Sequence, residues 1–242
     1  LQSRGLGDVY KRQDRKGSKM MDEQRVEVYF DSLRPDYPEY LNALEKEALR
    51  TEVPIIRRAT RDVLRYLLKT KKPARVLEVG TAIGYSALFM RHCLPETSKI
   101  TTIEKVEMRL VEARKNLERY DKTGQIELIE GDAVDVLQQL CEDRKTYDFI
   151  FMDAAKGQYL NFLPNVITLL EPGGVLISDN VLHDRDVLES RFAVTRRDRT
   201  IHARMREYLY TLMHHDKLET ICLSEGDGMT ISTRMEDDEN EK

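Results

Sequence analysis

Hydrophobic and polar positions along the chain alternate between short apolar runs and longer amphipathic stretches. The apolar runs predict strands at residues 76–79, 100–104, 126–130, 147–153 and 175–178. The amphipathic stretches predict helices at residues 85–93, 106–119, 134–140, 159–170 and 199–214. Strands that alternate with helices in this way indicate an α/β fold with a doubly wound parallel sheet.

Two more apolar runs follow the last long helix, at residues 218–223 and 229–233. The connection around Gly226-Asp227-Gly228 is too short for a crossover helix, so these runs predict an antiparallel hairpin. Residues 236–242 form an acidic tail that we expect to be disordered.

Helices are also expected before the first strand, at residues 22–32, 40–50 and 55–68, where they would form a lid or an interface layer. Pro54 precedes the third of these helices. The residues expected on the apolar faces of the second and third helices are Leu41, Leu44, Ala48, Leu49, Ile56, Ala59, Val63 and Leu67.

The natural domain is expected to span residues 20–235. Residues 1–19 are expected to be non-native or disordered, because residues 5–13 resemble translated sequencing-adapter read-through. A chain of 242 residues with 40% hydrophobic content can form one α/β core, and no stretch approaches the ~20 apolar residues of a membrane span. Cys93, Cys141 and Cys222 each lie among apolar neighbours, so we expect buried thiols and a cytoplasmic location. A net charge of −4 does not indicate a general nucleic-acid binder.

Residues 75–87 join the first strand to its helix through Gly80 and Gly84. Ligands of doubly wound folds bind beside such turns, and glycine allows close approach of the backbone. The spacing differs from the G-x-G-x-x-G of dinucleotide sites, which argues against an NAD-dependent reductase. Glycine also occurs in tight turns that bind nothing, so the motif alone does not establish a site.

Acidic residues stand at or near the carboxyl ends of the predicted strands, at Glu78, Glu104, Asp132, Asp153 and Asp179. Glu104 follows Gly80 by 24 residues, close to the ~20-residue spacing at which an acid reaches a ribose diol. The alternative is that Glu104 caps the next helix.

Asp153, Asp179 and Asn180 end two strands that we expect to be neighbours, and they offer only oxygen ligands. Such ligands select Mg²⁺ or Ca²⁺ over zinc, although Asp179-Asn180 alone could be a helix cap. Lys156 lies three residues after Asp153 and is a candidate general base if its pKa is lowered. A solvated lysine without a catalytic role is the alternative.

The segment from His183 to Arg206 is rich in arginine and carries a local excess of three positive charges. Arginine makes bidentate contacts with phosphate, so the segment is a candidate contact for a nucleic acid. A solvated loop of mixed charge is the alternative. The five histidines show no metal-ligand spacing, and we expect all of them to be satisfied or solvated.

Taken together, these motifs resemble the cation-dependent, S-adenosylmethionine-dependent O-methyltransferases of the catechol and caffeoyl-CoA type. The matching stretches are Val-Leu-Glu-Val-Gly-Thr-Ala-Ile-Gly-Tyr-Ser-Ala, Ile-Thr-Thr-Ile-Glu, Phe-Met-Asp-Ala-Ala-Lys-Gly-Gln-Tyr and Ile-Ser-Asp-Asn-Val-Leu. The resemblance implies a Rossmann-like class I methyltransferase fold, a homodimer, Mg²⁺ held by Asp153, Asp179 and Asn180, and catalysis by Lys156 and Asp153. It also implies a cofactor site lined by Ile56, Glu78, Gly80, Ser86, Glu104, Asp132, Ala133 and Asp153.

Within this family, the sequence is most similar to bacterial tRNA 5-hydroxyuridine methyltransferases, through Glu-Val-Pro-Ile, Arg-Arg-Asp-Arg-Thr and Gly-Asp-Gly. The expected reaction is therefore methylation of the 5-hydroxyl of wobble 5-hydroxyuridine in tRNA, with residues 185–206 contacting the tRNA. His183-Asp184-Arg185 departs from the family pattern of an aromatic or basic residue followed by glycine. The alternatives are O-methylation of a small catechol-like or phenolic metabolite and a catalytically silent nucleotide-binding module.

Overall fold

The computed structural model describes residues 25, 26, 28–183 and 185–236, and the chain divides into two compact units, Leu1–Glu39 and Tyr40–Lys242. In the first unit, residues 28–33 are helical. Residues 28–32 lie within the helix expected at residues 22–32, and Leu33 lies one residue beyond it. The expectations for residues 1–19 and for the acidic tail beyond residue 236 lie outside the described residues.

The second unit contains a seven-stranded sheet in the described part of the chain, with strand order β3-β2-β1-β4-β5-β7-β6. The first five strands in sequence run parallel, and β7 pairs antiparallel with both β5 and β6. The strands are β1 (Arg75–Val79), β2 (Lys99–Glu104), β3 (Ile126–Glu130), β4 (Tyr147–Met152), β5 (Leu170–Asp179), β6 (Leu218–Leu223) and β7 (Met229–Arg234). The predicted doubly wound sheet and C-terminal hairpin are confirmed.

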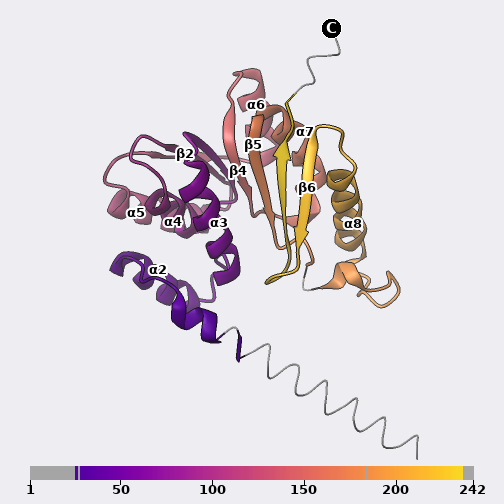
Figure 1. The fold of residues 1–242 in the computed structure, drawn as a ribbon, viewed down its shortest axis with the longest axis horizontal. Helices are drawn as coiled ribbons and strands as arrows, with labels where there is room; N and C mark the ends of the chain where they lie inside the picture. The colour runs from indigo at the N-terminus through magenta and orange to yellow at the C-terminus, as the bar shows by residue number, and fades with distance from the viewer. Residues whose placement is uncertain (1–24, 27, 184, 237–242) are drawn as a thin grey trace, which may run out of the picture. The chain divides into compact units, whose positions relative to one another are not determined.

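Helices cover both faces of this sheet, as Figure 1 shows, with α3, α4 and α5 packed together and α6, α7 and α8 forming a second group. The α-helices are α2 (Glu39–Arg50), α3 (Arg58–Lys71), α4 (Tyr85–Cys93), α5 (Glu107–Tyr120), α6 (Ala133–Glu142), α7 (Tyr159–Leu169) and α8 (Arg199–Met213). Two short 3₁₀ helices are η1 (Lys156–Gln158) and η2 (Asp186–Leu188). Among the described residues, no helix combines the length and apolar character needed to cross a bilayer.

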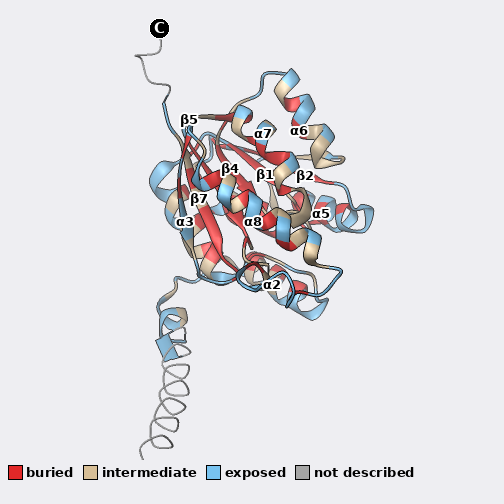
Figure 2. Cartoon of the chain, turned by 90° about the vertical axis from the view of Figure 1, so that its right-hand side faces the viewer, coloured by how far each residue is buried: buried red, intermediate tan, exposed pale blue. Residues whose placement is uncertain are grey.

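The middle of the sheet is buried on both faces, which explains the near-continuous apolar runs in the sequence. Figure 2 shows β1 and β4 largely in red, the colour of buried residues. Val79 at the end of β1 lies opposite Ile103 of β2 and Met152 of β4. The strand order reverses between β1 and β4, so the carboxyl ends of these two strands form the crevice where doubly wound folds bind ligands.

Several sequence expectations about the helices before the sheet are wrong in detail. α3 begins at Arg58 rather than at residue 55, and its buried face carries Thr60, Arg61, Leu64 and Leu68 instead of Ala59, Val63 and Leu67. The polar Thr60 and Arg61 can be buried because each has hydrogen-bond partners across the core. Leu49 of α2 is 67% exposed, so it is not part of that helix's buried face.

Two further expectations need correction. β5 begins at Leu170 rather than at residue 175, so the strand includes Pro172-Gly173-Gly174. Cys222 is exposed rather than buried, because it lies on β6 at the edge of the sheet.

Candidate active site

A pocket of about 560 Å³ opens at the carboxyl ends of β1, β2 and β4. Its volume lies within the range of small-molecule and cofactor sites. The predicted site residues that line it are Ile56, Gly80, Ser86, Glu104, Asp132, Ala133, Asp153, Lys156 and Asn180. Glu78 and Asp179 are almost fully buried and are not among the residues that line the pocket, but Asp179 directly precedes Asn180, which does line it.

Gly80 forms the turn that closes β1. Its φ of +105° lies in the left-handed region, and a Cβ built there would stand 2.1 Å from the carbonyl oxygen of Asp153. The N–H groups of Gly80 and Thr81 each donate to the carbonyl oxygen of Ile103 at 3.1 Å. Glycine is therefore required because the backbone after β4 passes close by, and the sequence argument from ligand approach alone missed this reason.

Glu78 lies under the pocket floor, on β1. It is fully buried and accepts a hydrogen bond from the Thr102 hydroxyl at 2.5 Å. Burial raises the pKa of Glu78 to about 7. The Glu78 carboxyl group therefore holds its proton more readily than an exposed glutamate does.

Glu104 lines the pocket, and it is not the N-cap of α5, because that residue is Val106. Glu104 Oε1 accepts from the backbone N–H groups of Lys105 and Val106, and its Oε2 accepts from that of Ala82, all at 2.9 Å. These three bonds fix the carboxylate at the end of β2 and connect it to the turn after Gly80. Glu104 is thus held rigidly in the position from which an acid reaches a ribose diol.

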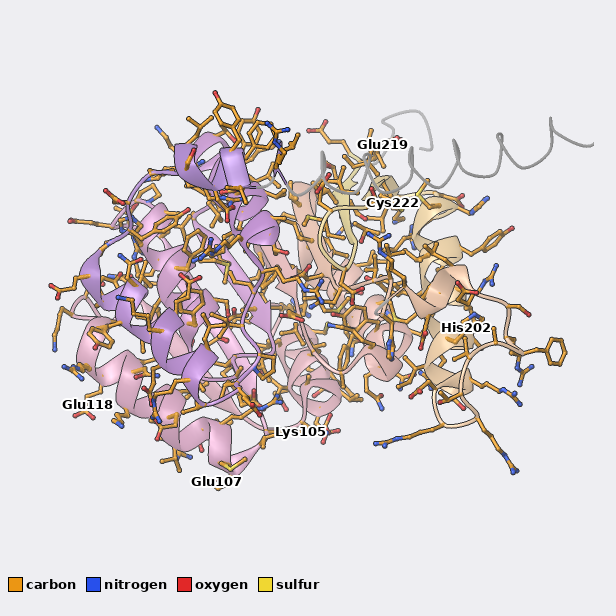
Figure 3. All side chains as sticks on the ribbon, turned by 90° about the horizontal axis from the view of Figure 1, so that it is seen from below. Lys105, Glu107, Glu118, His202, Glu219 and Cys222 are labelled. Carbon is orange, nitrogen blue, oxygen red and sulfur yellow. The ribbon has the colours of Figure 1, made fainter. Side chains whose placement is uncertain are left out.

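Asp132 lies farther along the same pocket, at the start of α6. Its Oδ1 accepts from the N–H of Val134 at 2.9 Å, which makes Asp132 the helix cap. Its Oδ2 pairs with Lys105 Nζ at 2.8 Å. Figure 3 shows Lys105 beside Glu107, where β2 leads into α5.

Asp153 and Asp179 follow adjacent strands, as the sequence predicted, because β4 pairs with β5. The Asn180 amide bridges toward Asp153, with Nδ2 donating to Asp153 Oδ1 at 3.0 Å. Oδ2 of Asp179 is buried and has no hydrogen-bond partner among the described residues. Burial, reinforced by repulsion from Asp153, raises the pKa of Asp179 to about 6.

The donor set fits a hard divalent cation. It consists of two carboxylates and one amide, and a cation would satisfy the orphaned oxygen of Asp179 and remove the repulsion between the carboxylates. Within the described residues, no three His, Cys, Asp or Glu side chains cluster to hold a metal. The amide oxygen of Asn180 would be the third protein ligand, with waters or substrate completing the coordination.

The Lys156 side chain is 18% exposed, and its ammonium group stays protonated. Its Nζ donates to Asp153 Oδ1 at 2.9 Å and to the Tyr159 hydroxyl at 3.0 Å. Burial alone would lower the pKa of Lys156, but Tyr159 and Asp153 outweigh that effect and raise it. A general base needs a lowered pKa, so this arrangement favours an orienting role for Lys156, and the base role stays a prediction.

Some site residues escaped the sequence argument. His183 lines the pocket, although nothing in the sequence assigned any histidine to a site. Asp227, at the tip of the β6–β7 hairpin, also lines it, and the flanking glycines were the available signal. His202 is satisfied, as expected: it is buried in α8, and its Nε2 lies 3.1 Å from the carbonyl oxygen of Glu189. Figure 3 shows it well apart from Lys105.

Comparisons with known proteins agree with this geometry. A family model described as O-methyltransferase matches residues 32–235. A catechol O-methyltransferase from Niastella koreensis is 34% identical over 127 residues, which cover 52% of this chain and 58% of that protein. A caffeoyl-CoA O-methyltransferase from Citrus natsudaidai is 29% identical over 220 residues, which cover 88% of this chain and 95% of that protein.

A solved structure is also similar over most of its length. It is the O-methyltransferase TomG from Streptomyces achromogenes, involved in tomaymycin synthesis and determined in complex with SAM (S-adenosylmethionine). Its TM-score is 0.74 at 25% identity, and the match covers 88% of this chain and 96% of that one.

Proposed function

Because this chain belongs to the O-methyltransferase family, we propose that it methylates one hydroxyl of an adjacent oxygen pair on a small catechol-like or phenolic metabolite. It is a SAM-dependent enzyme, as its structural relatives are. The proposal adds a divalent cation, Mg²⁺ in the first instance, held by Asp153, Asp179 and Asn180. The relatives named above as catechol and caffeoyl-CoA methyltransferases support a small aromatic substrate over a nucleic acid.

The observation that carries the proposal is that Oδ2 of Asp179 is buried and accepts no hydrogen bond from the described residues. Asp179 lies close to Asp153, and Asp153 lines the same pocket as Glu104. A bound divalent cation would supply charge that stabilises a substrate oxyanion at neutral pH and would fix the orientation of the two oxygens. The protein supplies the remaining rate acceleration by positioning the cofactor and the substrate. Glu104 and Asp132 hold the nucleoside part of the cofactor, and Lys156 orients Asp153, so that the methyl group and the hydroxyl meet in line.

A second candidate is 5-hydroxyuridine in tRNA, whose O4 and 5-hydroxyl form a similar oxygen pair. The observation that favours it is the exposure of most arginines in the segment from His183 to Arg206: Arg185, Arg191, Arg196, Arg197 and Arg206. Exposed arginine side chains can contact phosphates, whereas Arg206 also donates to the carbonyl oxygen of Glu189 at 3.4 Å and Arg204 is bonded to Asn161 at 2.7 Å. Asp184 of the same segment lies outside the described residues.

The first test addresses the cation. EDTA should abolish methylation and added Mg²⁺ should restore it, while SAM binding measured by calorimetry should persist in Asp179→Ala. Full turnover of metal-free enzyme in EDTA would refute the cation role.

The second test separates the substrates. Arg191, Arg196 and Arg197 are replaced together by alanine, since all are exposed, and a charge-matched control replaces Arg50, Arg119 and Arg144, which are exposed elsewhere. Both variants and the wild type are assayed with a free catechol and with tRNA that carries 5-hydroxyuridine. The proposal expects catechol methylation in all three proteins. Efficient methylation of the tRNA that is lost only in the first variant, with no turnover of catechol by the wild type, would favour the tRNA enzyme instead.

A further inference from the structure

We propose that Thr60 is a positioning residue that fixes the orientation of the Asp179 carboxylate, so that one of its oxygens faces the divalent cation. The inference rests on the cation role proposed above for Asp179. It gives α3, one of the helices expected to form a lid or an interface layer, a direct part in the active site.

The contact joins two segments that are 119 residues apart in sequence. Thr60 Oγ1 donates to Asp179 Oδ1 at 3.0 Å, and both residues are 2% exposed. The backbone N–H of Asn180 donates to the same oxygen at 2.9 Å. Oδ1 therefore receives two hydrogen bonds, whereas Oδ2 receives none from the described residues.

This asymmetry has an energetic consequence. A buried carboxylate oxygen without a donor is costly, so such an oxygen needs a partner. Rotation of the carboxylate away from this orientation would weaken both hydrogen bonds at once. The two donors thus hold one oxygen in place and leave the other available for a cation, in the way that outer-shell hydrogen bonds orient metal ligands.

The position of Thr60 in α3 supports the same conclusion. It is the third residue of the helix and lies on the buried face, together with Leu64 and Leu68. Packing alone would be served as well by valine, which has the same shape without the hydroxyl. The first turn of a helix also carries the positive end of the helix dipole, which favours a carboxylate there.

Thr60→Val and Thr60→Ser test the proposal, because valine removes only the hydrogen bond and serine retains it. The affinity for Mn²⁺ is measured by isothermal titration calorimetry without substrate, and the affinity for SAM is measured in parallel. Thr60→Val should weaken Mn²⁺ binding by about 10–100-fold, as expected for loss of an outer-shell partner, and Thr60→Ser should restore it to near the wild-type value. SAM affinity should be unchanged in both.

Thr70→Val is the matched control. Thr70 lies on the same helix, is exposed and donates to the carbonyl oxygen of Tyr66 at 2.7 Å, so its hydroxyl does not touch the site. This variant should bind Mn²⁺ like the wild type. If Thr60→Val does not fold, Thr60→Ala replaces it in the comparison with Thr60→Ser.

The outcomes separate this inference from the proposed function. If Asp179→Asn loses Mn²⁺ binding but Thr60→Val retains it, the positioning role is wrong and the cation site stands. If the wild type binds no Mn²⁺, the cation function itself fails, and the role of Thr60 fails with it. Loss of affinity in Thr60→Val that serine does not rescue would also refute the positioning role.

Discussion

Replacing Gly80 by alanine tests why the turn after β1 needs glycine. The φ of +105° at Gly80 costs an L-residue about 1–2 kcal/mol. The new Cβ would lie 2.1 Å from the carbonyl oxygen of Asp153, well inside the 3.0 Å that real Cβ contacts respect. Relief of this overlap requires backbone movement, comparable to overpacking a core at about 1–3 kcal/mol. Gly80→Ala should therefore lower the free energy of unfolding by about 2–5 kcal/mol.

Gly124→Ala separates the two contributions. Gly124 has a φ of +63°, and a Cβ there would meet nothing within 4 Å, so only the backbone strain of about 1–2 kcal/mol applies. Urea unfolding measures the stability of both variants, and calorimetry measures SAM affinity. Only Gly80→Ala should also lose SAM affinity, because it displaces Asp153 and the turn at the pocket. Equal destabilisation of the two variants, with SAM binding intact in Gly80→Ala, would refute the steric argument.

Three further predictions use groups buried around the pocket. Arg61→Met removes the cation that pairs with Glu45 at 2.9 Å, and it should cost about 3–5 kcal/mol in urea unfolding; a loss near zero would show that the pair is dispensable. Burial raises the pKa of Glu78 to about 7, so the folded state binds more protons than the unfolded state between about pH 4.5 and 7, and wild-type stability falls as pH rises through that window. Glu78→Gln should therefore gain about 2.5 kcal/mol relative to wild type between pH 5 and pH 8, and equal pH dependence would contradict this assignment. Tyr159→Phe removes the hydroxyl that accepts from Lys156 at 3.0 Å and should cost about 1–3 kcal/mol by the same assay, unless water replaces the hydroxyl.

The local pattern of the sequence was sufficient to predict most of the sheet. The strand at Ile126–Glu130 and the helix at Tyr85–Cys93 have the predicted bounds, because period and turn residues are local properties. The acids at strand ends were predicted to converge, since parallel strands bring their carboxyl ends to one edge, and the pairing of β4 with β5 places Asp153 beside Asp179.

Only the tertiary structure decided what these residues contact. Thr60 looks like an ordinary polar residue beside an apolar helix face, and its partner Asp179 is 119 residues away. The need for glycine at position 80 depends on the backbone of Asp153, and Lys156 is held in its charged form by Asp153 and Tyr159. Such facts follow from distances between distant segments. The sequence determined which acidic and amide side chains could lie at the edge of the sheet. The packing of α3, β4 and β5 decided which atom faces which. The reason is that hydrogen bonds and steric contacts act over a few ångströms in space and are independent of separation along the chain.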